Sequence, residues 1–83
     1  LPMVTKTLNL TRRERQIMEM FSQGYSAKEI GLHLFISLYT VETHRKHLIE
    51  KLGARNMPHA VRLALQNGFL EISQSLQVVE LPN

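Results

Sequence analysis

The sequence contains no cysteine, no tryptophan and no aspartate, and only 6% of its 83 residues are aromatic. Without cysteine the chain has no disulfide framework, no thiol nucleophile and no thiolate zinc site. Without aspartate it lacks carboxylates that commonly hold Mg²⁺ or Ca²⁺. No apolar run approaches the ~20 residues that a membrane-spanning helix needs, and no signal segment opens the chain. We therefore expect a cytoplasmic module with no metal, no cofactor and no membrane partner.

The residues that are present describe one small globular domain. Hydrophobic residues make up 43% of the chain, which is enough for a single core. Ten Lys and Arg outnumber seven Glu, so the formal net charge is +3. This excess permits an anionic partner but does not indicate one alone, because many ordinary domains carry it. Since the first residue is Leu1 and not methionine, we expect a fragment of a longer protein more readily than a processed one.

Two of the predicted helices begin with a capping box. In such a box a Ser or Thr side chain accepts from the third helical N–H, and a Glu at that position reaches back to the first residue. Thr11 with Glu14 has this spacing, and so has Ser26 with Glu29. Apolar residues follow at helical spacing on one face of each segment, at Ile17, Met18 and Phe21 and at Ala27, Ile30 and Leu34. Gly31 shares the second face and is tolerable if another helix crosses closely there.

A third helix is expected from Ser37, its N-cap, to about Leu52, where Gly53 stops it. Asn56 is expected to cap a fourth. No stretch alternates with period two for long enough to form a confident strand. The predicted fold class is therefore all-α, a four-helix bundle-like domain over residues 10–72 that contains a helix-turn-helix. Residues 1–9 are expected to form a loose lead-in and residues 73–83 a weakly ordered tail.

The outward side of the helix at residues 38–52 is polar. At about 100° per residue, two adjacent rows form. One row holds Thr40, His44, His47 and Lys51, and the other holds Tyr39, Thr43, Lys46 and Glu50, with Glu42 beside it. Such a surface suits the major groove, where base edges and phosphates both need hydrogen-bonding partners. The alternative is a solvated helix face. Under either interpretation an ion pair between Glu42 and Lys46 is expected in the free protein.

Four sequence blocks occur in order between residues 10 and 54. They are Leu10-Thr11-x-Arg13-Glu14, Gly24-x-Ser26-x-Lys28-Glu29-Ile30, Leu34-x-Ile36-Ser37-x-x-Thr40-Val41-x-x-His44 and Lys51-Leu52-Gly53-Ala54. Together they resemble the LuxR/FixJ/NarL-type effector domain. The resemblance implies a bacterial transcription regulator that binds double-stranded DNA as a homodimer. It also implies an upstream receiver or ligand-binding domain. RNA polymerase is a further partner that the resemblance makes possible.

The resemblance also assigns residues. It places Glu42, Thr43 and Lys46 at base-facing positions. Phosphate-contacting residues are expected at Ser26, Lys28, Ser37, Tyr39, Thr40, His44, His47 and Lys51, with Ser26 and Ser37 acting first as caps. The fourth helix commonly supplies a dimer contact, for which Leu63 and Leu65 lie off the inner stripe. Many relatives carry Lys where this chain has Glu42, so the base readout is expected to differ.

Other interpretations are weaker. His44 and His47 are three residues apart, but zinc needs three or four ligands, and no Cys or Asp assists them. No nucleophile, base and pocket occur together, so we expect no enzyme. Tyr25, Phe35 and Tyr39 are expected in core or staple positions and not as a stacking platform. Two rival functions remain, a promoter-binding module like region 4 of a sigma factor and a helical protein-interaction module without DNA binding.

Overall fold

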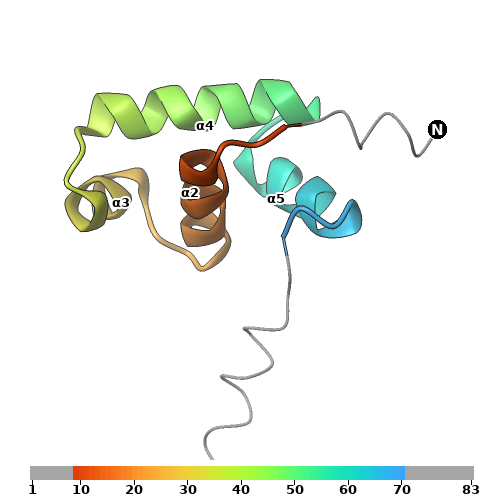
Figure 1. Ribbon diagram of the computed structural model, residues 1–83, viewed down its shortest axis with the longest axis horizontal. Helices are drawn as coiled ribbons and strands as arrows, with labels where there is room; N and C mark the ends of the chain where they lie inside the picture. The colour runs from red at the N-terminus through yellow and green to blue at the C-terminus, as the bar shows by residue number, and fades with distance from the viewer. Residues whose placement is uncertain (1–8, 71–83) are drawn as a thin grey trace, which may run out of the picture.

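The computed structural model describes residues 9–70, which form four helices and no strand (Figure 1). The helices are α2 (Arg12–Ser22), α3 (Ala27–Leu34), α4 (Leu38–Leu52) and α5 (Met57–Gln66). The expected all-α class with a helix-turn-helix is therefore confirmed. The predicted tail at residues 73–83 lies outside the described residues, and so does the predicted lead-in except for Asn9.

Each helix begins at the residue that the sequence predicts. At α2, Glu14 N donates to Thr11 Oγ1 over 3.0 Å, and Thr11 N donates to Glu14 Oε1 over 2.9 Å. The same reciprocal pair starts α3, with distances of 3.1 and 2.8 Å between Ser26 and Glu29. These boxes satisfy N–H groups that a helix leaves unpaired at its first turn. Local side chains thus fix both starts.

The remaining boundaries are also set locally. Thr40 N donates to Ser37 Oγ over 3.0 Å at the start of α4, and His59 N donates to Asn56 Oδ1 over 2.8 Å at the start of α5. Gly53 ends α4 in the left-handed region, with φ of 65°, which glycine adopts without steric penalty. The predicted caps and the predicted stop of the third helix are confirmed.

All four helices contribute to one core. Its fully or almost fully buried side chains are Ile17, Met18, Ile30, Val41, Leu48, Met57, Ala60, Ala64 and Leu70. Leu70, which follows α5, is 5% exposed and so joins this core from beyond the last helix. Arg15 Nη1 donates to the carbonyl oxygen of Phe69 over 3.0 Å and so ties α2 to the turn that follows α5.

Gly31 is buried at the junction of α3 and α4. A Cβ atom there would lie 2.8 Å from the carbonyl oxygen of Ile36 and 3.7 Å from Cγ2 of Val41. The expectation was that a crossing helix comes close at this point. The nearest atom instead belongs to the turn between α3 and α4, and the nearest atom of α4 is farther away, at 3.7 Å. Only glycine leaves room for this turn to fold back on α3 without a shift.

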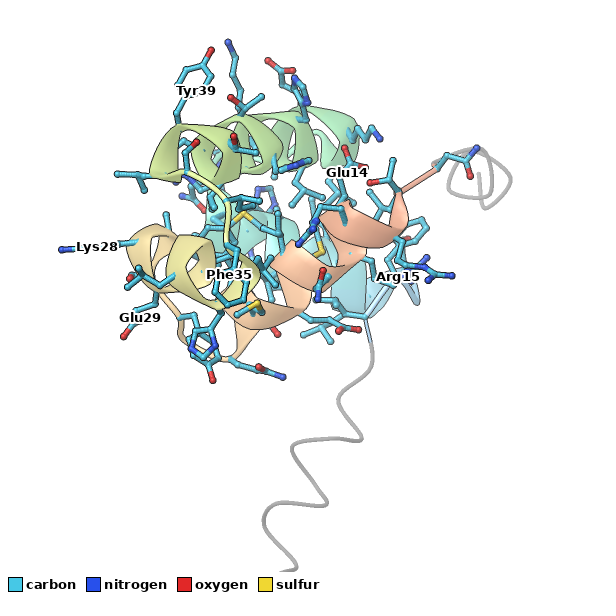
Figure 2. All side chains as sticks on the ribbon, turned by 60° about the vertical axis from the view of Figure 1, so that its left-hand side comes forward. Glu14, Arg15, Lys28, Glu29, Phe35 and Tyr39 are labelled. Atoms are coloured by element: carbon cyan, nitrogen blue, oxygen red, sulfur yellow. The ribbon has the colours of Figure 1, made fainter. Side chains whose placement is uncertain are left out.

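Two aromatic residues are not in the positions that we expected. Phe35 is 93% exposed and Tyr39 is 80% exposed, and Figure 2 shows Tyr39 pointing away from the other helices. Phe35 caps α3 in the left-handed conformation, with φ of 59°, and its side chain turns outward with the chain. Of the three aromatic residues expected in core or staple positions, only Tyr25 is partly buried, with its ring 5.0 Å from that of His33 in an edge-on arrangement.

Candidate nucleic-acid interface

One long side of α4 faces none of the other three helices that the structure describes. In Figure 1, α4 runs along the top of the molecule, and α2, α3 and α5 all lie on its lower side. Val41 and Leu48 point to those helices and are fully buried. The opposite side of α4 is open to solvent because nothing in residues 9–70 covers it. An exposed helix of 15 residues is about 22 Å long, a suitable size for a DNA groove.

The three residues predicted to face bases lie on this open side or at its margin. Lys46 is exposed, whereas Glu42 and Thr43 are half-buried. Thr43 Oγ1 donates to the carbonyl oxygen of Tyr39 over 3.0 Å, so its hydroxyl is held against the preceding turn. Lys46 makes no recorded hydrogen bond with any described residue, which leaves its three N–H donors for a partner.

Glu42 pairs with Arg45 and not with Lys46, so the expected pair on this face is wrong. Arg45 Nε donates to Glu42 Oε1 over 2.8 Å, and both side chains are close to half exposed. Three-residue and four-residue spacings are both neighbours on a helix, so the spacing alone does not choose between two cations. The aliphatic stem of Arg45 can pack beside the buried stripe while its guanidinium reaches solvent, and 42% of the side chain is exposed.

The predicted phosphate contacts fall into two groups. Ser26 and Lys28 lie at the start of α3, where Figure 2 shows Lys28 pointing outward in a direction different from that of Tyr39. The other six belong to α4 or its cap, namely Ser37, Tyr39, Thr40, His44, His47 and Lys51. Ser37 Oγ lies 2.9 Å from Thr40 Oγ1, so the two hydroxyls share one hydrogen bond at the first turn.

The histidines of α4 differ in exposure. His47 is exposed, whereas His44 is half-buried and its Nδ1 is buried without a hydrogen-bond partner among the described residues. Within residues 9–70 no group of three His, Cys, Asp or Glu side chains could hold a metal ion.

Lys51 makes contacts that the sequence does not reveal. Its Nζ donates to Glu14 Oε1 over 2.7 Å and to the carbonyl oxygen of Asn9 over 2.9 Å. Burial of Glu14 would by itself raise the pKa of its carboxyl, but the hydrogen bond and charge of Lys51, together with the N–H of Thr11, outweigh burial and lower that pKa. One N–H of the Lys51 ammonium remains for a phosphate.

Comparison with known proteins identifies the family. Residues 8–64 match the family described as "Bacterial regulatory proteins, luxR family". The chain belongs to this family. Its helix-turn-helix lies wholly within the matched residues, so the family match covers the open side of α4. A luxR-family domain is a DNA-binding module of transcription regulators and not an enzyme, which confirms the functional class expected from the four sequence blocks.

Individual proteins that the chain is similar to agree with this assignment. The chain is 42% identical over 62 residues to the "Oxygen regulatory protein NreC" of Staphylococcus aureus strain JH9, and equally so to that of strain USA300. The aligned part is 75% of this chain and 29% of NreC. The solved "Structure of Transcription factor, GerE" has 39% sequence identity and a TM-score of 0.72, covering 75% of this chain and 92% of that one.

Two residues important to this luxR-family surface escaped the sequence analysis. The role of Glu14 in holding Lys51 was missed because the two residues are 37 positions apart and only the folded chain brings them together. The ion pair between Arg45 and Glu42 was also missed, because its only sequence signal is an acid three residues earlier. No helix in the described part of the chain is long and apolar enough to cross a membrane.

Proposed function

We propose that this domain binds duplex DNA by placing the open side of α4 in the major groove. The observation that carries the proposal is that no helix within residues 9–70 lies against this side, which presents donors and acceptors that no described residue pairs with. The base edges of the groove offer the complementary groups. Base readout is assigned to Glu42, Thr43 and Lys46.

Phosphate contacts on either side of the groove would fix the position of α4. The start of α3 offers Lys28 and the N-terminal N–H groups behind Ser26, which attract anions. Along α4, contacts are assigned to Ser37, Tyr39, Thr40, His44, His47 and Lys51. Because these contacts carry no base information, they would contribute equally on any duplex.

Further parts of the proposal concern the longer protein, its assembly and its place in the cell. The chain covers 29% of the length of the NreC proteins, so most of the length of each NreC protein lies outside the aligned part. The full-length protein is proposed to carry an upstream domain. This domain would be either a receiver, as in a response regulator, or a ligand-binding domain. Two copies would bind two half-sites through α5, and bound dimers would contact RNA polymerase. Cytoplasmic action follows from a DNA target in a bacterial cell.

The test is a two-stage binding experiment with the 83-residue chain. Selection from a pool of random duplexes gives a preferred site, and fluorescence anisotropy then compares that site with a scrambled duplex at several salt concentrations. We expect tighter binding to the selected site and a negative slope of log affinity against log salt on both duplexes. No salt-dependent binding to either duplex would support a protein-interaction module instead. Equal affinity for both would contradict sequence-specific readout.

A further inference from the structure

The phosphate contacts assigned to α4 leave one edge of the helix without a cation. At about 100° per residue, Thr40, His47 and Lys51 fall within about 40° of one another. Arg45 lies about 120° to 160° from all three, on the other side of the open face. A helix in the major groove has a phosphate backbone along each wall, so both edges of α4 would meet negative charge.

Arg45 is held in a position to serve that second edge. Its Cα lies beside the buried stripe, but the 2.8 Å contact between Arg45 Nε and Glu42 Oε1 draws the guanidinium toward the open face. The side chains of Arg45 and Glu42 are 42% and 44% exposed, so the pair lies at the boundary between core and solvent. Arg45 and Glu42 also line one surface hollow together with Lys46, Ile49 and Glu50.

The guanidinium keeps most of its donors. An arginine has five N–H groups, and the bond to Glu42 uses only the one on Nε. The four N–H groups on the two terminal nitrogens make no recorded hydrogen bond with the described residues. A planar fork of free N–H groups matches the oxygens of a phosphate.

The same pair accounts for an acidic residue on a DNA-binding helix. A lone Glu42 would repel phosphates and lower affinity for every duplex. With Arg45 bound to it, the local charge is neutral, and Oε2 of Glu42 stays free to accept from a base such as cytosine. We propose that Arg45 contacts a DNA phosphate on the groove wall opposite Lys51, with Glu42 as the positioning residue. This inference rests on the proposed function, since it requires α4 to lie in the groove.

The first test uses Arg45→Gln with Arg62→Gln as its control, because Arg62 is an exposed arginine on α5. Both variants are checked for native thermal unfolding. We expect Arg45→Gln to weaken binding to the selected and the scrambled duplex by the same factor. The slope of log affinity against log salt should become about 0.9 less negative. The affinity of the variant should therefore fall about threefold less than that of the wild type between roughly 50 and 200 mM salt. A slope equal to that of Arg62→Gln would overturn the proposal. A loss on the selected duplex alone would also overturn it, because that is the result for a base contact.

The second test locates the phosphate. Single neutral methylphosphonates are introduced along both strands of the selected site, and the affinity of the wild-type chain and of each variant is measured. Wild-type binding should weaken at phosphates on both groove walls, and Arg45→Gln should lose the sensitivity on one wall only. Glu42→Ala should reduce that same sensitivity while the charge of Arg45 is retained.

Two results of this scan contradict the inference. If wild-type binding were sensitive to methylphosphonates on one groove wall only, no phosphate would be contacted on the wall assigned to Arg45. Unchanged sensitivity in Glu42→Ala would remove the positioning role of Glu42. Failure of the proposed function is distinguishable, because the wild-type chain itself would then bind neither duplex.

Discussion

The Nζ of Lys51 lies 2.7 Å from Oε1 of Glu14, and this contact joins the last turn of α4 to the first turn of α2. The same carboxylate oxygen accepts the backbone N–H of Thr11 in the capping box of α2. One buried carboxylate therefore connects the start of one helix with the end of the proposed recognition helix. Truncating either partner leaves a polar group poorly paired at this junction.

The first prediction concerns the stability that this junction contributes. Lys51→Ala should lower the free energy of unfolding by about 1–3 kcal/mol, because Glu14 stays buried after losing its charged partner. Urea unfolding followed by circular dichroism measures the change. Lys46→Ala is the control, because Lys46 is an exposed lysine of the same helix. Its substitution should lower the free energy of unfolding by less than about 0.5 kcal/mol. Equal effects of the two substitutions would contradict a structural role for Lys51.

The same lysine is also a predicted phosphate contact, and the two roles give separate readouts. If the third N–H of its ammonium reaches DNA, Lys51→Ala weakens all duplexes similarly, and the slope of log affinity against log salt becomes about 0.9 less negative. The measurement is made at a temperature where the variant is fully folded. An unchanged slope alongside lower stability would assign Lys51 to the fold alone.

Stability should depend on pH through Glu14. Its folded pKa lies below the ordinary value, so its contribution is fully present above the unfolded pKa of about 4.3. As the pH falls from there through the lowered folded pKa, protonation is favoured in the unfolded chain and the contribution is lost. Because the other glutamates titrate nearby, the informative quantity is the wild-type stability minus that of Glu14→Gln. This difference should be constant near pH 7 and shrink below about pH 4; a constant difference down to pH 3 would contradict it.

Gly31 should not tolerate a side chain. Alanine favours a helix over glycine by about 1 kcal/mol, so Gly31→Ala would stabilise α3 if space were available. Its Cβ would lie 2.8 Å from a backbone oxygen, that of Ile36, which cannot rotate away. We expect a net destabilisation of about 1–3 kcal/mol in urea unfolding. Leu32→Ala, at a neighbouring exposed position, serves as control and should change stability little. A stabilised Gly31→Ala variant would show that the turn can move.

The sequence predicts features that depend on neighbouring residues more reliably than those that depend on the fold. The caps at Thr11, Ser26 and Ser37 are predicted because the donor and acceptor lie three residues apart. The contact between Lys51 and Glu14 requires two helices to be placed first. Phe35 was misplaced because its left-handed backbone, which no local pattern indicates, decides where its side chain points.

Lys46 offers the most direct test of base readout. It is exposed on the open side of α4, and its ammonium is long enough to reach guanine O6 and N7. Lys46→Ala should cost about 1–3 kcal/mol of binding free energy on the selected duplex and much less on a scrambled one. Arg62→Ala, which removes the same charge from α5, controls for net charge. Equal losses on both duplexes would assign Lys46 to a phosphate.

The last prediction concerns assembly through α5. Leu63 is half-buried and Leu65 is 37% exposed, and neither belongs to the buried stripe of Met57, Ala60 and Ala64. Single exposed leucines are common, so exposure alone does not identify a contact. So short a helix offers little area, and we expect the isolated domain to be mostly monomeric at micromolar concentration. Two half-sites on one duplex would raise the effective concentration of the second copy and make a weak symmetric contact measurable.

Leu63→Glu and Leu65→Glu test this contact, with Gln66→Glu as a control that adds the same charge at an exposed position of the same helix. Sedimentation gives the state of the free chain, and titrations use duplexes with one and with two half-sites. We expect both leucine variants to bind a single half-site as the wild type does and to lose cooperativity on the double site, because a buried glutamate opposes a shared apolar contact. The control should keep its cooperativity. If neither leucine variant loses cooperativity, the dimer contact lies on another surface of the domain or upstream of it.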